Sequence, residues 1–252
     1  MINNIFSNMP PVVKNILLLN VIMYIITYFG ESQGIQMTSI LGGYVFSSPF
    51  FEPYQMVTHF FMHGGFFHLL FNMFALVVFG SVLEQVWGPK RFFFFYFLTA
   101  IGAFVLHQVV GYIEVAHLKE QLVAAGFTDN DFFELKDRMI ELRREGKMMA
   151  GNAPLLQNYI TGISIPVVGA SGAVYGVLVA FGMLFPNTRL MLLFPPIPIR
   201  AKYLVGIMIV LELYYSFQAT PGDNVAHLAH IGGALVGFIM VLIWRKDRRN
   251  FY

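Results

Sequence analysis

The sequence has no cysteine among its 252 residues and few charged residues, which make up 12% of the chain. The missing cysteines exclude disulfides, thiolate metal sites and a cysteine nucleophile. The charged fraction is about half that of a soluble domain. With 57% hydrophobic residues, it indicates that lipid is the main solvent. A net charge of +2 is too small to indicate a nucleic-acid partner.

Six segments approach the roughly 20 apolar residues that a membrane-spanning helix needs. They predict an all-α membrane protein, a bundle of six transmembrane helices that forms a single domain over residues 1–252. The fourth and fifth segments are short, so we expect their ends to lie below the membrane surface or at a thinned bilayer. In chain order the segments are about Val12–Phe29, Phe66–Val82, Phe92–Val110, Ala170–Phe185, Tyr203–Phe217 and Ala226–Trp244.

The distribution of Lys and Arg predicts how this bundle is oriented. Ten of the sixteen Lys and Arg residues fall on one side of the six-helix topology. The other six lie in one long segment, about Ile113–Pro166, together with eight acids. The opposite-side loops Gly30–Gly65 and Gln218–Val225 contain neither Lys nor Arg. The positive-inside rule therefore predicts a multi-pass protein of the cell membrane with both termini in the cytoplasm.

The long segment, about residues 113–166, is an insertion between the third and fourth helices that has a helical pattern of its own. Thr128 and Asp129 are placed to cap a helix that Gly146 would end. Apolar residues recur within it at helical spacing, which predicts an amphipathic helix against the membrane surface or the protein. A role in substrate binding is the alternative. The apolar residues are Phe132, Leu135, Met139 and Leu142.

A serine opens the fourth helix in Gly169-Ala170-Ser171-Gly172. The first turn of a helix leaves amide N–H groups unpaired, and the helix dipole favours negative charge nearby. Both properties suit an oxyanion that forms beside Ser171. The alternative is packing alone, because Gly172-x-x-x-Gly176 is a small-residue motif in which serine is ordinary.

His230 opens the sixth helix and favours the chemical interpretation. Gly233-x-x-x-Gly237 follows it and permits close helix approach. The fourth and sixth helices start at the same membrane face, so Ser171 and His230 can come within hydrogen-bond reach. Serine needs such a base to become a nucleophile at neutral pH. His227, nearly one turn earlier, is the competing base, and we expect it to be more exposed.

The pattern favours a Ser–His dyad, because no acid is an obvious third member. Tyr175 lies four residues after Ser171 on the same helix face, where its ring can pack on His230 and hold the imidazole's orientation. Glu84 in the second helix is expected to make a helix-end hydrogen bond. Glu212 in the fifth helix has no assigned role, although acids at membrane depth are costly and often functional.

A second polar cluster, His59, His63, His68 and Asn72, lies at the start of the second helix. His68 and Asn72 are four residues apart, share a face, and both donate hydrogen bonds. We favour an oxyanion hole facing Ser171. A buried structural network and a metal site are the alternatives. The sequence has no His-Glu-x-x-His motif, and no acid lies near this cluster, which argues against a metal site. We therefore predict neither a metal nor a cofactor.

Together these residues resemble the rhomboid family of intramembrane serine proteases in order and spacing. The resemblance covers about Lys14–Trp244 except most of the insertion. Two departures stand out: the loop between the first two helices lacks the Trp-Arg pair of many relatives, and the insertion is long. The matching motifs are His59-x-x-x-His63, His68-x-x-x-Asn72, Gly169-x-Ser171-Gly172 with Tyr175, and Ala229-His230-x-x-Gly233-x-x-x-Gly237.

The resemblance implies Ser171 as nucleophile and His230 as general base. It implies an oxyanion hole of His68, Asn72 and the Ser171 backbone N–H, with His63 as a structural histidine of the first loop. Water would enter from the outer face. Substrates, the transmembrane segments of other membrane proteins, would enter from the bilayer near the second and fifth helices, with Phe71 as a gate or pocket residue.

Two other functions remain as alternatives to proteolysis. A rhomboid-like protein without protease activity would bind membrane clients and escort or retain them, and the presence of both Ser171 and His230 argues against it. A small-solute transporter would show inverted repeats with broken helices at the midplane, and that signature is not apparent in the sequence.

Overall fold

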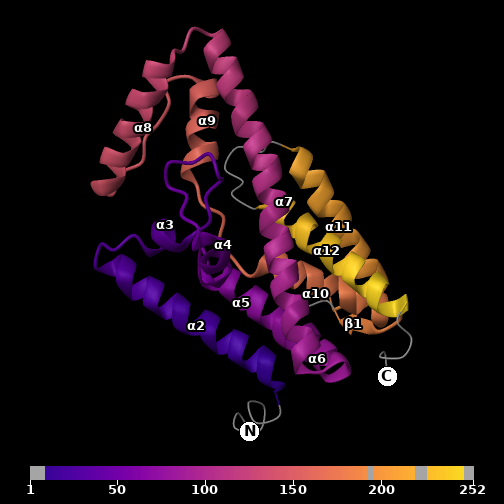
Figure 1. Cartoon of the computed structure of the whole chain (residues 1–252). Helices are drawn as coiled ribbons and strands as arrows, with labels where there is room; N and C mark the ends of the chain where they lie inside the picture. The colour runs from indigo at the N-terminus through magenta and orange to yellow at the C-terminus, as the bar shows by residue number, and fades with distance from the viewer. Residues whose placement is uncertain (1–8, 192–195, 219–225, 247–252) are drawn as a thin grey trace.

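The computed structural model describes residues 9–191, 196–218 and 226–246, and this part of the chain is mostly helical (Figure 1). A small antiparallel hairpin pairs β1 (Arg189–Met191) with β2 (Pro198–Arg200). The helices are α2 (Pro11–Ser32), α3 (Met37–Leu41), α4 (Gln55–Thr58), η1 (His59–Phe61), α5 (Phe66–Ala75), η2 (Leu76–Gly80), α6 (Ser81–Trp87), α7 (Pro89–Ala124), α8 (Asp129–Arg144), α9 (Pro154–Ser164), α10 (Ser171–Leu184), α11 (Ala201–Phe217) and α12 (His227–Lys246).

The bundle is that of a multi-pass membrane protein. Within the described residues, four helices are long and apolar enough to cross a membrane, and α10 is apolar but shorter. All six segments expected from the sequence are helical, whereas their number of membrane crossings stays a prediction. The four long spans are Pro11–Ser32, Phe66–Trp87, Pro89–Ala124 and His227–Arg245.

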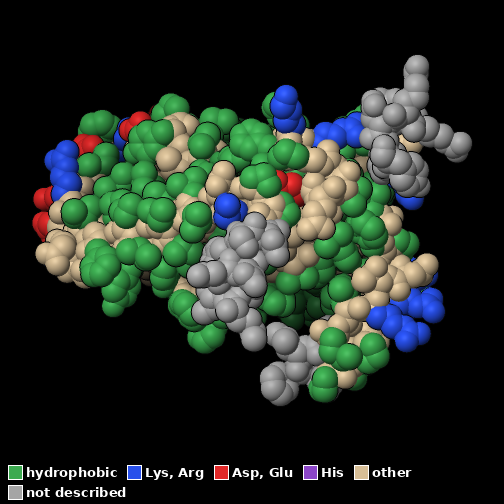
Figure 2. Space-filling model, turned by 90° about the horizontal axis from the view of Figure 1, so that it is seen from below, with side chains coloured by type: hydrophobic (Ala, Val, Ile, Leu, Met, Phe, Trp, Pro, Cys, Tyr) green, Lys and Arg blue, Asp and Glu red, His purple; other side chains and the backbone are tan. Residues whose placement is uncertain are grey.

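Lys and Arg surround the end of the bundle where α2 begins and α12 ends. Figure 2 shows this end, with blue side chains around a surface that is otherwise largely hydrophobic. The elements that meet here are the start of α2, the α6–α7 turn, the β-hairpin, the start of α11 and the end of α12 (Figure 1). Glu84 of α6 accepts hydrogen bonds from the backbone N–H groups of Val12 and Val13, at 2.9 and 2.8 Å. The expected helix-end role of Glu84 is thereby confirmed.

The helix that follows Gly88 is longer than its apolar run. We expected it to end near Val110, but α7 continues to Ala124. Its extension packs against α8 and α9 in a second hydrophobic cluster that includes Val115 and Leu122. Buried partners supplied by the insertion therefore stabilise helix beyond the stretch that lipid alone would favour.

The predicted amphipathic helix of the insertion is α8. Thr128 caps it in a reciprocal capping box, completed by Asp131 rather than by Asp129. The hydrogen bonds from Thr128 lower the pKa of the Asp131 carboxyl. Leu135 and Met139 of the predicted stripe are buried in the cluster with α7 and α9. The stripe therefore contacts the protein.

An arginine of the insertion holds the first loop, residues 33–65. Arg143 donates through Nη2 to the Ser39 carbonyl. Its guanidinium lies over the rings of Phe50 and Tyr44, at 4.3 and 5.1 Å from their centroids. The Gln36 amide donates back to the Arg143 carbonyl at 3.3 Å. The first loop, which has no Trp-Arg pair, thus receives its arginine from α8.

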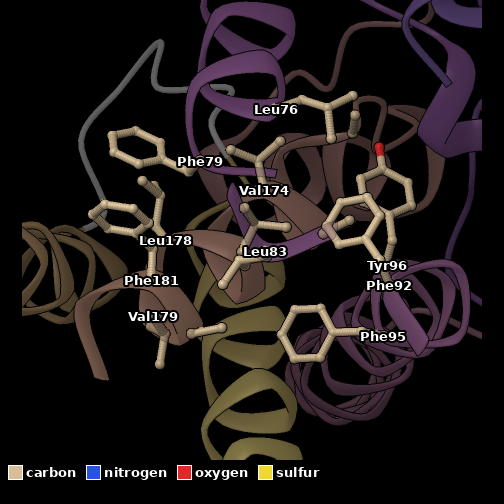
Figure 3. Close-up of a cluster of buried hydrophobic side chains, with 14 of the residues drawn as sticks. Leu76, Phe79, Leu83, Phe92, Phe95, Tyr96, Val174, Leu178, Val179 and Phe181 are labelled. Atoms are coloured by element: carbon tan, nitrogen blue, oxygen red, sulfur yellow. The ribbon is translucent and has the colours of Figure 1, made fainter. Parts of the chain in front are cut away.

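Helix α10 occupies the centre of the bundle. Ten of its fourteen residues are buried, so it faces protein on nearly all sides, next to α7, α11, α12 and η2 (Figure 1). Figure 3 shows Val174, Leu178 and Phe181 of α10 among side chains of η2 and α6. Phe181 packs edge-on against Phe79 with centroids 4.9 Å apart. This core fixes the helix that begins at Ser171.

Glycines let α10 and α12 touch through their backbones. A Cβ added to Gly233 would lie 1.8 Å from the Gly172 carbonyl oxygen, and one on Gly237 would lie 2.8 Å from the Gly176 Cα. A Cβ on Gly172 would meet the Ala103 side chain of α7 at 2.5 Å. The two predicted small-residue motifs therefore face each other, and α7 packs against α10 beside this contact.

We predict that Gly233→Ala destabilises the protein by at least about 3 kcal/mol, because the added methyl would collide with backbone rather than with a side chain that can rotate away. Gly206→Ala is the matched control: it is also mid-helix, and no atom of the described part of the chain lies within 4 Å of its added Cβ. The control should be neutral or gain about 0.5–1 kcal/mol. Thermal unfolding in detergent measures both, and equal stability of the two variants would contradict the packing described here.

We also predict that Arg143→Ala loosens the first loop at a cost of about 1–2 kcal/mol, from the lost cation–π contacts and hydrogen bond. Arg144→Ala, an exposed neighbour on the same helix, is the control. Hydrogen exchange of residues 36–50 should accelerate in the first variant only. Unchanged exchange in Arg143→Ala would show that the arginine does not hold this loop.

Candidate active site

The first turns of α10 and α12 bring Ser171 and His230 together. His230 Nε2 lies 2.8 Å from Ser171 Oγ, and the His230 side chain is 10% exposed. The backbone contact between Gly172 and Gly233 makes this distance possible, because Gly172 directly follows Ser171 and Gly233 lies three residues after His230. The expected hydrogen-bond reach is present, while the catalytic roles of the two residues stay predictions.

Tyr175 stacks on the His230 ring. The ring centroids are 4.4 Å apart and the planes differ by 11°, as expected from the position of Tyr175 one turn after Ser171. The Tyr175 hydroxyl donates to Oε1 of Glu212 on α11. The imidazole is therefore held between a serine hydroxyl at one nitrogen and an aromatic face.

Glu212 is the residue of this site that sequence reasoning left without a role. Its Oε2 lies 2.6 Å from His227 Nδ1 and 3.0 Å from His230 Nδ1. The signal in the sequence was an acid deep in an apolar segment, but its partners depend on how α11 is turned. His227, the competing base, is only slightly more exposed than His230, with side chains 13% and 10% exposed.

The donor atoms of Glu212, His227 and His230 lie within 4.8 Å of one another, so these residues could hold a divalent cation. The two nitrogen–oxygen distances, 2.6 and 3.0 Å, are those of hydrogen-bonded or ion-paired groups. Tetrahedral zinc ligands at about 2.0–2.1 Å from the metal would stand roughly 3.3 Å apart. The arrangement fits a proton-sharing network better than a tetrahedral metal site.

His68 lies on the other side of Ser171, against Gly169. A Cβ on Gly169 would stand 2.8 Å from His68 Nε2 and 3.5 Å from Ser171 Oγ. Gly169 has a φ of +123°, a conformation that side chains other than glycine's rarely allow. Glycine is therefore required twice, for this turn and for the close approach of the imidazole.

The backbone fixes which nitrogen of His68 carries its proton. The Gly64 N–H donates to His68 Nδ1 at 3.3 Å, so Nε2 is the protonated nitrogen. Asn72, one turn later, is 5% exposed and its Nδ2 donates to the His68 carbonyl at 2.9 Å. Both predicted oxyanion residues thus lie on α5, with the Nε2–H donor of His68 beside Gly169.

The first loop supplies two buried histidines, His59 and His63, that pack around the site. His63 packs edge-on against His68 with centroids 5.2 Å apart, and burial lowers the pKa of His63 to about 4. His59 stacks on Phe104 of α7 at 4.4 Å, and its carbonyl accepts the Gly169 N–H at 3.0 Å. His59 therefore holds the turn before Ser171, a role that the sequence did not indicate.

Helix α10 is shorter than a full membrane span, and the expected position of Ser171 below the membrane surface stays a prediction. The 14 residues of α10 rise roughly 21 Å at 1.5 Å per residue, which is less than the roughly 30 Å of a bilayer's hydrocarbon. Phe71, the expected gate residue, is 59% exposed on α5 and stacks on Phe67 at 6.4 Å.

Comparison with known proteins identifies the family of the chain. The Rhomboid domain model matches residues 51–128 and 147–247, which include every residue of the site. The chain belongs to the rhomboid family. The internal stretch that the model leaves out, 129–146, is α8 with the residues just after it, so the helix that carries Arg143 lies outside the matched ranges.

Curated relatives of this rhomboid are distant. It is 25% identical to "Rhomboid-like protein 11, chloroplastic" of Arabidopsis thaliana, over 92% of this chain and 64% of that one. It is 26% identical to "Rhomboid protein 1, mitochondrial" of Saccharomyces cerevisiae, over 71% of this chain and 38% of that one. It is 27% identical to "Putative rhomboid protease YdcA" of Bacillus subtilis, over 44% of this chain and 57% of that one. The chain therefore spans less than two thirds of the length of these relatives.

Proposed function

We propose that this rhomboid is an intramembrane serine endopeptidase that cuts transmembrane segments of other membrane proteins, with Ser171 as nucleophile and His230 as general base. The observation that carries the proposal is the 2.8 Å contact between His230 Nε2 and Ser171 Oγ. A serine beside a buried imidazole is the minimal unit of nucleophilic acyl transfer. Membership of the rhomboid family supports the same reaction class.

The reaction follows from the positions of the two side chains. His230 Nε2 takes the Ser171 proton while Oγ attacks the carbonyl carbon of the scissile peptide bond. The imidazolium then returns the proton to the leaving amine, and the acyl group stays on Ser171. A water molecule, activated by His230 in the same way, releases the acyl group and restores the serine.

The negative charge on the carbonyl oxygen would meet three donors. The Ser171 backbone N–H lies in the first turn of α10, where amides have no intrahelical partner. His68 would donate through Nε2–H, since its Nδ1 is occupied by the Gly64 N–H. Asn72 has a second amide hydrogen besides the one it gives to the His68 carbonyl. Such donors act strongly in a site from which bulk water is excluded.

A membrane substrate must expose its peptide bond before it is cut. A transmembrane helix hides its amides in internal hydrogen bonds, so it must unwind locally, and Gly or Pro in the segment lowers that cost. Entry from the bilayer between α5 and α11, past Phe71, would bring an unwound segment to Ser171 from the side. Water would reach the site from the outer face of the membrane.

We predict that a fluorophosphonate labels the wild type at Ser171, because the reagent needs both an activated serine and an oxyanion hole. Ser171→Ala should lose all labelling and all cleavage of a panel of transmembrane substrates. His230→Ala should lose nearly as much. Asn72→Ala should fall about 10²–10³-fold, the usual cost of one oxyanion donor.

Each variant must first melt as the wild type does, because His68 and Asn72 also lie in the packed interior. A folded wild type that neither labels nor cleaves would refute the proposal and favour a non-proteolytic protein that binds membrane clients. Labelling that survives His230→Ala but is lost in His227→Ala would assign the base to His227.

We further propose that six helices cross the cell membrane, with both termini in the cytoplasm and the site open to the outer face. The chain has no cysteine, so single introduced cysteines can be labelled without background. Exposed Ser47, in the first loop, should react from outside, and exposed Asn187, before β1, only from inside. External reaction at Asn187 would contradict this orientation. Asn250, a further inside position, lies outside the described residues.

A further inference from the structure

The carboxylate of Glu212 lies where α10, α11 and α12 meet. Oε1 accepts the Tyr175 hydroxyl of α10. Oε2 faces two histidines of α12, with His227 Nδ1 at 2.6 Å and His230 Nδ1 at 3.0 Å. The residue is 8% exposed. One acidic group is therefore in contact with side chains on both helices that carry the proposed dyad.

Packing alone does not explain an acid at this position. Helix α11 buries only Ala201, Val205 and Glu212 among its residues. A cavity of about 470 Å³ lies next to the site, between α11 and the helices α10 and α12. A buried carboxylate carries a large desolvation cost, and an apolar side chain of similar size usually packs at a lower one. The charge of Glu212 is better explained by the groups that face it.

The carboxylate determines which nitrogen of His230 carries its proton. An imidazole nitrogen that faces a carboxylate is the protonated one, so Nδ1 holds the hydrogen and Nε2 keeps its lone pair. That lone pair faces Ser171 Oγ at 2.8 Å and can accept the serine proton. The other tautomer would direct Nε2–H at the serine, where it cannot act as a base.

The same carboxylate would stabilise the charge that forms during attack. When His230 takes the serine proton it becomes an imidazolium, and its Nδ1–H lies 3.0 Å from a negative oxygen. Within the described residues, His230 Nδ1 has no aligned hydrogen bond at rest, whereas His227 Nδ1 has one to Glu212. Catalytic hydrogen bonds are often loose at rest and tighten in the transition state.

We propose that Glu212 is the positioning acid of this site, which makes it a Glu–His–Ser triad in place of the dyad expected from the sequence. The proposal rests on the proposed proteolytic function. Tyr175 and His227 hold the carboxylate from either side, and the carboxylate in turn orients His230. Glu212 touches neither the scissile bond nor Ser171, so it acts only through the histidine.

The test is Glu212→Gln, which keeps the size of the side chain and removes its charge. We expect kcat for a transmembrane substrate to fall about 10–10³-fold with KM within about twofold, less than the roughly 10⁴-fold loss when a serine protease loses its triad acid. The smaller loss is expected because Tyr175 still stacks on His230. Fluorophosphonate labelling should slow in parallel, and Glu212→Asp should restore part of the rate.

Two further variants, together with Glu212→Asp and the wild type, decide the outcome. Glu120→Gln makes the same change on a side chain that is 81% exposed on α7, and it should leave kcat unchanged. His227→Ala should cost less than Glu212→Gln, and an equal loss would mean that the acid serves His227 instead. A folded Glu212→Gln with wild-type kcat would overturn the proposal. A change that appears only in KM, and that Glu212→Asp does not relieve, would overturn it as well. An inactive wild type would overturn the proteolytic function as well.

Discussion

The backbone contact between α10 and α12 is the constraint on which the rest of the site depends. Gly172 and Gly233 leave no room for a Cβ between them. In lipid there is little hydrophobic force to press helices together, so close van der Waals packing of small residues supplies much of the attraction. Because Ser171 and His230 lie at the same ends of these helices, their separation is set by that contact. The glycines set the distance between Ser171 and His230, and the hydrogen bond between the two side chains sets their relative orientation.

A second set of contacts holds the turn that precedes Ser171. Gly43 and Val167 pair through two backbone hydrogen bonds of 2.9 and 2.8 Å, and the His59 carbonyl accepts the Gly169 N–H. Gly169 is thereby fixed in its positive-φ conformation against the His68 ring. The first loop is itself tied to α8 through Arg143. Helix α8, which the Rhomboid domain model does not match, thus contacts the loop that supplies His59 and His63 to the surroundings of His68 and Gly169.

Burial in a membrane gives each polar group of the site a heavy cost if it is left unpaired. The structure meets this cost with short-range partners: Glu212 faces Tyr175 and two histidines, and His68 receives the Gly64 N–H. Glu212 and its partners come from the C-terminal half of α11 and from the N-terminal halves of α10 and α12.

The sequence by itself determined the helices, the glycine motifs and the candidates Ser171 and His230. These features are local: apolar runs, small residues at fixed spacing and a serine at a helix start are visible in one stretch of chain. It also allowed Tyr175 to be placed on His230, because residues four apart share a helix face.

Only the tertiary structure decided the partners of Glu212, the proton position on His68 and the contact of Arg143 with the first loop. Each depends on how one helix is rotated and how far it is displaced relative to another. Glu212 lies 15 residues before His227 along the chain, and Arg143 lies 104 residues after Ser39. Helical periodicity in one segment cannot give such rotations, because they are set by the packing of the whole bundle.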